Sequence, residues 1–339
     1  MNPFSLLLRN LVHAVTAVLM LIPVMLTMGE AGDPNTPVKT YPDSTNPYIT
    51  EYLSPDIAAH RSGAGLAPQN TLMAFENIVG NSNSSADTLE FDVQITADGE
   101  LVLMHDLMYD SITNAEEEFG RKGVFVSSLT LEEAQRLNLG ENFEINGEYP
   151  YKGLRGDDIP ENLRVVTCDR VIDYVEANCR SRKYNYVIEI KSIGANGMKA
   201  ADKLYSIITE RGLQDRVIWS TFAPLTSSYM EKQYPEIPRT ADAIEAIQFY
   251  FHFRMDWDLQ DIAPSYEALQ IPYGASALDN AINLGTRELL NYAHSNNIAV
   301  QYWTINSEED IRTLTLNGAD CIMTDYPETA YEVIKDCRH

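Results

Sequence analysis

Apolar and polar residues alternate along one short stretch, Thr88–Gln94, in a pattern that predicts a β-strand. Successive side chains of a strand point to opposite faces. Glu90 and Asp92 would therefore share a solvent-facing side, while the apolar residues at the odd positions would face a packed layer. Two like charges about 7 Å apart repel each other. An acidic pair without a ligand is the alternative, but we favour a divalent metal ion as the group that offsets them.

The same kind of short apolar run recurs along the chain, and helical segments separate most of the runs. The predicted strands are Ile57–His60, Thr88–Ile95, Leu101–His105, Tyr186–Ile190, Val217–Phe222, Ala268–Ile271, Ile298–Trp303 and Ala319–Thr324. The predicted helices are Asn70–Val79, Asn196–Arg211, Thr286–Asn296 and Ser307–Leu316. About eight strands interleaved with helices favour a parallel sheet closed into an α/β barrel, the TIM (β/α)8 fold.

Two stretches interrupt this alternation. Residues 107–161 are polar and contain one convincing helix, Leu131–Leu137, so we interpret them as an insertion between the second and third barrel strands. Residues 242–266 contain an aromatic cluster that could either wall a substrate cleft or pack against the outside of the barrel. We favour the packing interpretation.

The N-terminal region has a different composition from the rest of the chain. Residues 1–31 contain a nearly uncharged apolar run, residues 11–28, followed by small residues, which is typical of a cleaved secretory signal. An uncleaved membrane anchor formed by residues 10–28 is the alternative. Residues 32–50 are rich in proline and polar residues and predict a linker, so the barrel would occupy residues 51–339. We therefore expect an exported protein, periplasmic or extracellular.

Charge and cysteine content exclude some classes of function. The 339-residue chain has a formal net charge of −24, which argues against nucleic acid as a partner, because affinity for phosphate backbones comes from Lys and Arg. The four cysteines allow three pairings if all are oxidised, with free buried thiols as the alternative, and they show no zinc-binding spacing. Cys168 and Cys179 at the two ends of one helix would lie about 16 Å apart, too far for a disulfide.

A series of short motifs follows the predicted strands in a fixed order. The motifs are His60-Arg61, Asn70-Thr71, Glu90-x-Asp92, His105-Asp106, Glu189-Ile190-Lys191, Trp303-Thr304-Ile305-Asn306, Gly318-Ala319-Asp320 and Thr324-Asp325. Over residues 56–336 the chain resembles the glycerophosphodiester phosphodiesterase family. Two positions depart from that family's pattern, since Ser62 replaces the usual glycine and Gln69 replaces the usual glutamate.

Elementary chemistry agrees with what the resemblance implies. In such barrels the active site lies at the carboxyl ends of the strands. Carboxylate oxygens are ligands that hard cations prefer, so Glu90, Asp92 and Glu189 would hold one Ca²⁺ or Mg²⁺ ion. The basic side chains of Arg61 and Lys191 would face the phosphate of the substrate.

The remaining candidate residues would transfer protons or shape the site. His60 and His105 would act as an acid-base pair, because imidazole can serve in either role at neutral pH. Trp303 would offer an apolar wall to the glycerol of the substrate, with core packing as the alternative. We interpret Asn70 as a helix cap and Asp325 as a turn residue rather than a site residue.

The function implied by the resemblance is hydrolysis of small glycerophosphodiesters, such as glycerophosphocholine, to an alcohol and sn-glycerol 3-phosphate. The family also implies that a glycerol hydroxyl of the substrate attacks first and that water then opens the cyclic phosphate. One alternative is a phospholipase of the related barrel superfamily, of the phosphatidylinositol-specific phospholipase C or sphingomyelinase D type. Another is a catalytically inactive extracellular binding barrel. Membrane association would have to come from the N-terminal segment.

Overall fold

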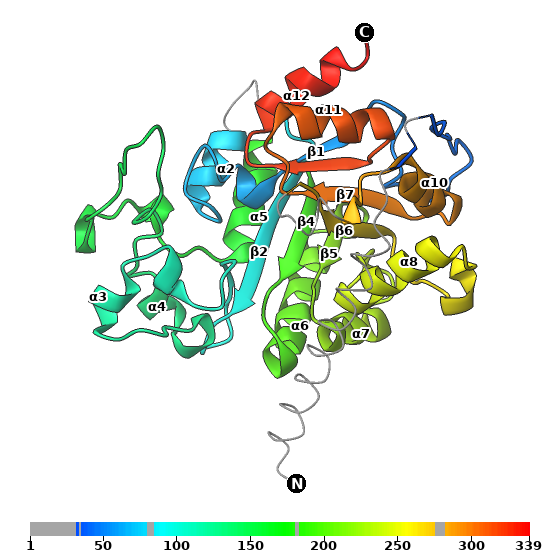
Figure 1. The fold of residues 1–339 in the computed structure, drawn as a ribbon. Helices are drawn as coiled ribbons and strands as arrows, with labels where there is room; N and C mark the ends of the chain where they lie inside the picture. The colour runs from blue at the N-terminus through cyan, green and yellow to red at the C-terminus, as the bar shows by residue number, and fades with distance from the viewer. Residues whose placement is uncertain (1–31, 34, 80–84, 180–182, 275–281) are drawn as a thin grey trace.

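Seven parallel strands form the curled sheet at the centre of the molecule, in the spatial order β5-β4-β2-β1-β8-β7-β6 (Figure 1). The computed structural model describes residues 32–33, 35–79, 85–179, 183–274 and 282–339. The strands are β1 Asp56–Ala59, β2 Thr88–Ile95, β3 Leu101–Leu103, β4 Asn185–Ile190, β5 Val217–Ser220, β6 Ala268–Pro272, β7 Ala299–Trp303 and β8 Cys321–Thr324. The helices are α2 Leu72–Val79, α3 Ala115–Phe119, α4 Leu131–Ala134, α5 Cys168–Asn178, α6 Gly194–Glu210, α7 Pro224–Gln233, α8 Ala243–Met255, α10 Arg287–Ser295, α11 Glu308–Asn317 and α12 Pro327–Asp336.

A short extended segment closes the sheet into a barrel. Arg239 pairs in parallel with Trp219 of β5, and Thr240 pairs in parallel with Ala268 of β6. The backbone N–H of Thr240 donates to the carbonyl of Trp219 at 3.1 Å, and that of Ala241 donates to the carbonyl of Ala268 at 2.8 Å. This segment therefore supplies the missing eighth position between β5 and β6. The predicted TIM-barrel fold is confirmed.

One predicted barrel strand is not part of the barrel. The run Leu101–His105 forms β3, which pairs antiparallel with β2 and lies off the parallel path. The true eighth position, at residues 239–240, was not predicted because it is polar and only two residues long, so it has no apolar run. It is held by its neighbours on both sides and not by its own β-propensity.

The two faces of the sheet carry side chains of different size. Inside the barrel lie small or branched residues, among them Ala58, Val187 and Ala299, since an eight-stranded barrel has little room at its centre. Outside, large residues such as Phe91 and Trp219 pack against the surrounding helices. The odd-numbered residues of β2 belong to this outer layer, as predicted, so Glu90 and Asp92 point into the barrel.

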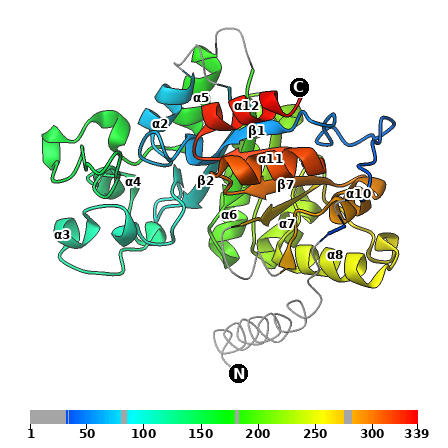
Figure 2. The ribbon, with the colours of Figure 1, turned by 45° about the horizontal axis from the view of Figure 1, so that its top comes forward.

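Residues 107–161, which include α3 and α4, lie to one side of the barrel next to β2 (Figures 1 and 2). They share a hydrophobic cluster with β3, in which Tyr109, Val126 and Leu137 pack with Val102 of β3 and with Met104, the residue after it. This shared cluster fixes the segment against the rim of the barrel. The predicted helix at 131–137 is present but shorter, as α4, and α3 was not predicted.

The aromatic stretch within residues 242–266 packs on the outside of the barrel. It forms most of α8, where the rings of Phe249 and Phe253 lie 5.4 and 5.6 Å from the ring of Tyr292 on α10. The packing interpretation is therefore confirmed for Phe249 and Phe253, while Trp257, which follows α8, is about half exposed.

The segment predicted to be a linker runs along the barrel instead of away from it. The side-chain amide of Asn46 donates to the backbone carbonyls of Glu267 and Asn297 at 2.7 and 2.8 Å. Tyr48 and Ile49 pack against the small residues inside the barrel. A polar segment that cannot fold alone is thus held in place by contacts with the barrel.

The predicted leader, residues 1–31, lies outside the described residues. Among the described residues, no helix is both long and apolar enough to cross a bilayer. All four cysteines are free thiols, and Cys168 and Cys179 stand at opposite ends of α5.

Candidate active site

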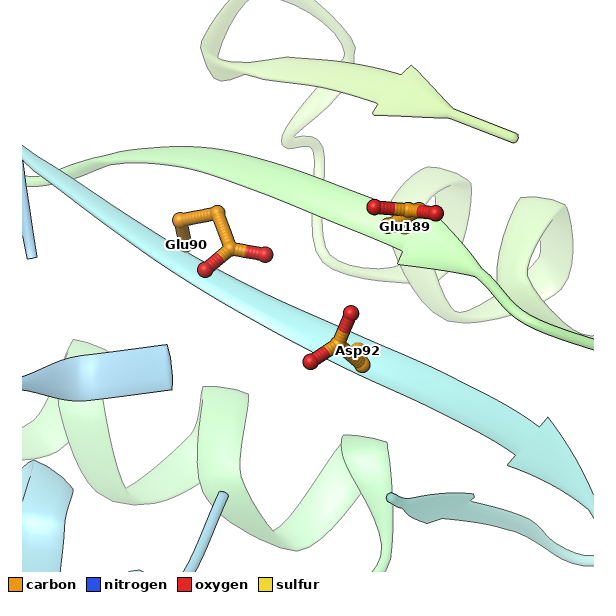
Figure 3. Close-up of side chains that lie close together, drawn as sticks. All are labelled: Glu90, Asp92 and Glu189. Atoms are coloured by element: carbon orange, nitrogen blue, oxygen red, sulfur yellow. The ribbon is translucent and has the colours of Figure 1, made fainter. Parts of the chain in front are cut away.

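Three carboxylates from two neighbouring strands meet inside the mouth of the barrel (Figure 3). Asp92 of β2 is the register partner of Glu189 of β4, and Glu90 lies two residues earlier on β2. One oxygen from each of the three side chains lies within 4.8 Å of the other two. The exposed fractions of Glu90 and Asp92 are 4% and 1%. The prediction that Glu90 and Asp92 face solvent is therefore wrong, because their side of the strand faces the closed interior of the barrel.

The spacing of these oxygens fits a single divalent cation. Two ligand oxygens on opposite sides of one Ca²⁺ ion are separated by about twice the Ca–O distance, or about 5 Å. The observed span of 4.8 Å is within that limit. Three buried carboxylates also form the all-oxygen donor set that Ca²⁺ and Mg²⁺ prefer. The donor atoms and their spacing therefore fit such an ion.

Two basic side chains partly compensate the carboxylates. The Nζ atom of Lys191 lies 2.6 Å from Oε1 of Glu189 and 3.3 Å from Oδ1 of Asp92. The Nε atom of Arg61 lies 3.6 Å from Oδ2 of Asp92, and the backbone N–H of Arg61 donates to Oε2 of Glu90 at 2.7 Å. Both predicted phosphate-binding residues thus lie at the acidic cluster.

Burial and mutual repulsion move the pKa values of the three carboxyl groups apart. Burial, followed by repulsion from Asp92, raises the pKa of Glu90. Burial is also the largest influence on Glu189 and raises its pKa to about 7, although Lys191 opposes the change. Burial would raise the pKa of Asp92 too, but Lys191 and Arg61 outweigh it, and the pKa is lowered. At neutral pH, Asp92 is therefore the most firmly ionised of the three.

Asn70 holds Asp92 from the other side. Its side-chain amide donates to Oδ2 of Asp92 at 2.9 Å, and its side-chain carbonyl accepts from the backbone N–H of Asp92 at 3.1 Å. The interpretation of Asn70 as a helix cap is wrong. The hydroxyl of Thr71 caps α2 instead, accepting from the N–H of Ala74 at 3.2 Å.

His60 lies at the end of β1, where a carboxylate fixes its ring. Its Nδ1 lies 2.7 Å from Oδ1 of Asp325. Asn306 in turn donates to Oδ2 of Asp325 at 2.7 Å and accepts from the backbone N–H of Asp325 at 2.9 Å. The interpretation of Asp325 as only a turn residue is therefore wrong. The contact between His60 and Asp325 follows from the closed sheet and not from the local sequence. Ala59 of β1 pairs with Thr324 of β8, so the residue after each of them lies beside the other.

His105 is fixed in the same way on the β3 side of the mouth. Its Nδ1 lies 2.7 Å from Oδ1 of Asp106. The turn that carries both residues is held by Gln94, whose amide donates to the backbone carbonyls of Met104, His105 and Asp106 at 3.1, 3.3 and 2.5 Å. We did not predict a role for Gln94, although the strand alternation places it on the same face as Glu90 and Asp92.

The pKa values of the two histidines are shifted in opposite directions. Burial would lower the pKa of His60, but the hydrogen bond to Asp325 and the charge of Glu90 outweigh it, so the pKa is raised. Burial also lowers the pKa of His105. The charge of Asp92 opposes this change but is too weak to cancel it, so the pKa of His105 is lowered. In both rings the carboxylate holds Nδ1, so Nε2 is the nitrogen that faces away from it, and in His60 this Nε2 accepts a hydrogen bond from Nε of Arg61 at 3.2 Å. The arrangement can therefore supply a proton acceptor and a proton donor at the same pH.

An aromatic pair lies beside Lys191. The ring of Trp303 lies 5.8 Å from the ring of Phe222, and Nζ of Lys191 lies 5.5 Å from that same ring. Trp303 also packs on the interior cluster of the barrel, so it contributes both to the core and to the mouth. Phe222 follows the end of β5 and was not predicted as a site residue.

A comparison with known protein families matches residues 60–329 to the glycerophosphoryl diester phosphodiesterase family. The chain belongs to this family. The resemblance inferred from the sequence motifs is therefore confirmed, and the protein is an enzyme of the phosphodiesterase class.

Curated relatives in this phosphodiesterase family cover most of the chain. The glycerophosphodiester phosphodiesterase of Caldanaerobacter subterraneus subsp. tengcongensis is 28% identical over 279 residues, which span 82% of this chain and 97% of the relative. The enzyme of the same name from Bacillus subtilis is 27% identical over 293 residues, 84% of this chain and 88% of the relative.

Solved structures show the same fold. A crystal structure of a glycerophosphoryl diester phosphodiesterase homologue from Silicibacter pomeroyi has a TM-score of 0.62 at 22% identity and covers 83% of this chain and 93% of that one. A phosphodiesterase from Oleispira antarctica, solved with the product sn-glycerol-3-phosphate, has a TM-score of 0.57 at 19% identity and covers 83% of this chain and 97% of that one.

The two departures from the family pattern differ in their physical effect. Gln69 accepts a hydrogen bond from Nη1 of Arg61, so the neutral amide still holds the guanidinium. Ser62 is fully buried, has a left-handed φ of 60°, and its hydroxyl has no hydrogen-bond partner among the described residues. Both features are unfavourable, because a side chain crowds the left-handed conformation and a buried hydroxyl without a partner loses its hydration.

We expect the substitution Ser62→Gly to stabilise the protein by about 1 kcal/mol, since glycine adopts a left-handed φ without strain and removes the unpaired hydroxyl. The midpoint of chemical denaturation measures this change. A lower midpoint than that of the wild type would show that the Ser62 side chain contributes packing that outweighs its strain.

Proposed function

We propose that the chain hydrolyses water-soluble glycerophosphodiesters to an alcohol and sn-glycerol 3-phosphate. The observation that carries this proposal is the pairing of two imidazoles, each held at Nδ1 by a carboxylate, with a buried trio of carboxylates between two basic side chains. Family membership and the product complex of the Oleispira antarctica phosphodiesterase support the same reaction.

Formal charges favour a phosphodiester anion once a divalent cation is bound. Glu90, Asp92 and Glu189 contribute three negative charges when ionised, and Arg61 and Lys191 contribute two positive charges, which leaves a net charge of −1. A bound Ca²⁺ or Mg²⁺ ion would change the net charge to +1 and would polarise a phosphoryl oxygen. Arg61 and Lys191 would then orient the remaining phosphoryl oxygens.

The two histidines would perform the proton transfers. One Nε2 takes the proton from the glycerol hydroxyl of the substrate that attacks phosphorus, and the other gives a proton to the oxygen of the leaving alcohol. In the second step water opens the cyclic phosphate, and each histidine performs the reverse transfer. Asp325 and Asp106 keep each ring in the orientation that presents Nε2.

The comparisons favour small diesters over intact phospholipids as substrates. The matching family model and the curated relatives carry the name of glycerophosphodiester enzymes and not that of phospholipases. Trp303 and Phe222 would then cover the carbon side of a glycerol unit.

We also propose that the protein is exported. The support is the sequence of residues 1–31, in which a nearly uncharged apolar run precedes small residues.

A chelator should abolish hydrolysis of glycerophosphocholine and glycerophosphoethanolamine, and added Ca²⁺ or Mg²⁺ should restore it. The substitution Glu189→Gln keeps the shape of the side chain but removes its charge, so we expect kcat/KM to fall by at least about 100-fold. Release of glycerol 3-phosphate measures the rate.

Glu51→Gln is the matched control, since Glu51 is exposed and lies outside the acidic cluster. Full activity in the presence of chelator, or in Glu189→Gln, would contradict the metal site. Turnover of intact phospholipid with no turnover of either small diester would contradict the proposed substrate class.

The plot of kcat/KM against pH should have one limb that reports His60 and one that reports His105. The substitution Asp325→Asn should shift only the first. The carboxylate of Asp325 raises the pKa of His60, so its loss should move the limb that reports His60 to lower pH. The limb that reports His105 should stay in place, because Asp106 and not Asp325 holds that ring. Loss of the charge should also lower kcat by about 10²-fold or more.

The complementary variant is Asp106→Asn, which should move the limb that reports His105 to lower pH, since the hydrogen bond that His105 donates to Asp106 raises the pKa of His105. A profile that is the same in the wild type and in both variants would show that neither imidazole transfers a proton in the rate-limiting step.

A further inference from the structure

A cavity of about 410 Å³ opens beside the catalytic residues and extends between the barrel and the segment 107–161. His60 and Arg61 line its barrel side. The opposite wall comes from residues far from the barrel strands in sequence: Ile112, Leu139, Asn142, Phe143 and Glu144. A substrate whose phosphate lies at Arg61 would therefore extend toward this wall.

The part of the wall nearest Glu144 is a well-defined hairpin. Ile145 and Glu148 exchange two backbone hydrogen bonds of 3.0 Å, and the two residues between them, Asn146 and Gly147, both have positive φ. That combination is typical of a tight type I′ turn. The conformation of the hairpin is therefore fixed by its own residues.

Side-chain contacts hold the three residues that precede the turn. The hydroxyl of Tyr149 donates to Oε2 of Glu144 at 2.7 Å. The ring of Phe143 lies 6.2 Å from the ring of Tyr151, and the amide of Asn142 donates to the carbonyl of Ser111 at 3.0 Å. The carboxylate and the aromatic face are thus positioned before any ligand arrives.

Charge is distributed unevenly along this cavity. On the barrel side the Nε atom of Arg61 lies 3.6 Å from Oδ2 of Asp92, while Glu144 on the opposite wall forms no ion pair with a Lys or Arg of the described residues. The basic residue of the hairpin region, Lys152, lies instead over the ring of Tyr149, with Nζ 5.2 Å from its centroid. The other carboxylate of the lining, Asp325, is paired with His60. Within the described part of the chain, the cavity therefore has a carboxylate without an ionic partner on the wall that faces Arg61.

We propose that Glu144 and Phe143 form a subsite for a cationic amino-alcohol head group, such as choline or ethanolamine. The carboxylate attracts the ammonium charge, and the aromatic ring offers a π face, which favours a quaternary ammonium group. This inference rests on the proposed function, since the head group is the alcohol that the proposed reaction releases. It assigns substrate selectivity to the segment 107–161, while the barrel supplies the chemistry.

The test compares kcat/KM for three substrates with the full-length protein: glycerophosphocholine, glycerophosphoethanolamine and glycerophosphoglycerol, whose head group is neutral. In Glu144→Gln, the ratio of cationic to neutral substrate should fall by about tenfold. In Phe143→Leu, which keeps an apolar side chain, the ratio should fall more for choline than for ethanolamine. Glu148→Gln is the matched control on the same hairpin and should keep the wild-type ratio.

Unchanged ratios in Glu144→Gln would overturn the subsite while leaving the proposed hydrolysis intact. If the wild type hydrolyses none of the three diesters, the proposed function fails, and the subsite is then judged by titration with choline alone followed by NMR. Saturable choline binding that weakens in Glu144→Gln but not in Glu148→Gln supports the subsite. Equal binding in all three proteins, or none in the wild type, overturns it.

Discussion

The mutual repulsion of three buried carboxylates is the constraint on which the rest of the site depends. Glu90, Asp92 and Glu189 bring oxygens within 4.8 Å of one another in the interior of a barrel, where water cannot screen them. Lys191, Arg61 and the amide of Asn70 reduce this cost but do not remove it, as the raised pKa of Glu189 shows. A buried cluster of carboxylates that is only partly compensated favours the binding of a positively charged ligand at the barrel mouth. A divalent cation is the ligand that this charge and donor set suit best.

Neutral amides fix the side chains around this cluster to which we assign proton transfer. Asn306 fixes Asp325, which fixes His60, and Gln94 fixes the turn that carries His105 and Asp106. An amide can donate and accept hydrogen bonds without adding a charge. Further acids or bases at these positions would have shifted the pKa values of the histidines again, so the amides orient the rings while leaving the electrostatic balance to the cluster.

Sequence reasoning found the residues of the site in two ways, from the alternation along one strand and from the order of the family motifs. Alternation along β2 placed Glu90 and Asp92 on one face, but alternation cannot distinguish an exposed face from a barrel interior, and so their burial was missed. Asp325 was missed because its partner, His60, is 265 residues away, and only the pairing of β1 with β8 brings the two together. The short barrel segment at Arg239 and Thr240 was missed because its neighbours, not its own residues, impose the extended conformation.

The most direct test of the account is X-ray diffraction from crystals of the full-length protein soaked in Mn²⁺, a hard divalent cation with a measurable anomalous signal. The account predicts one strong anomalous peak in the barrel mouth, within coordination distance of carboxylate oxygens of Glu90, Asp92 and Glu189. Absence of a peak at that position, with Nζ of Lys191 still in contact with Glu189 and Asp92, would show that the lysine is the permanent counterion and would contradict the metal site.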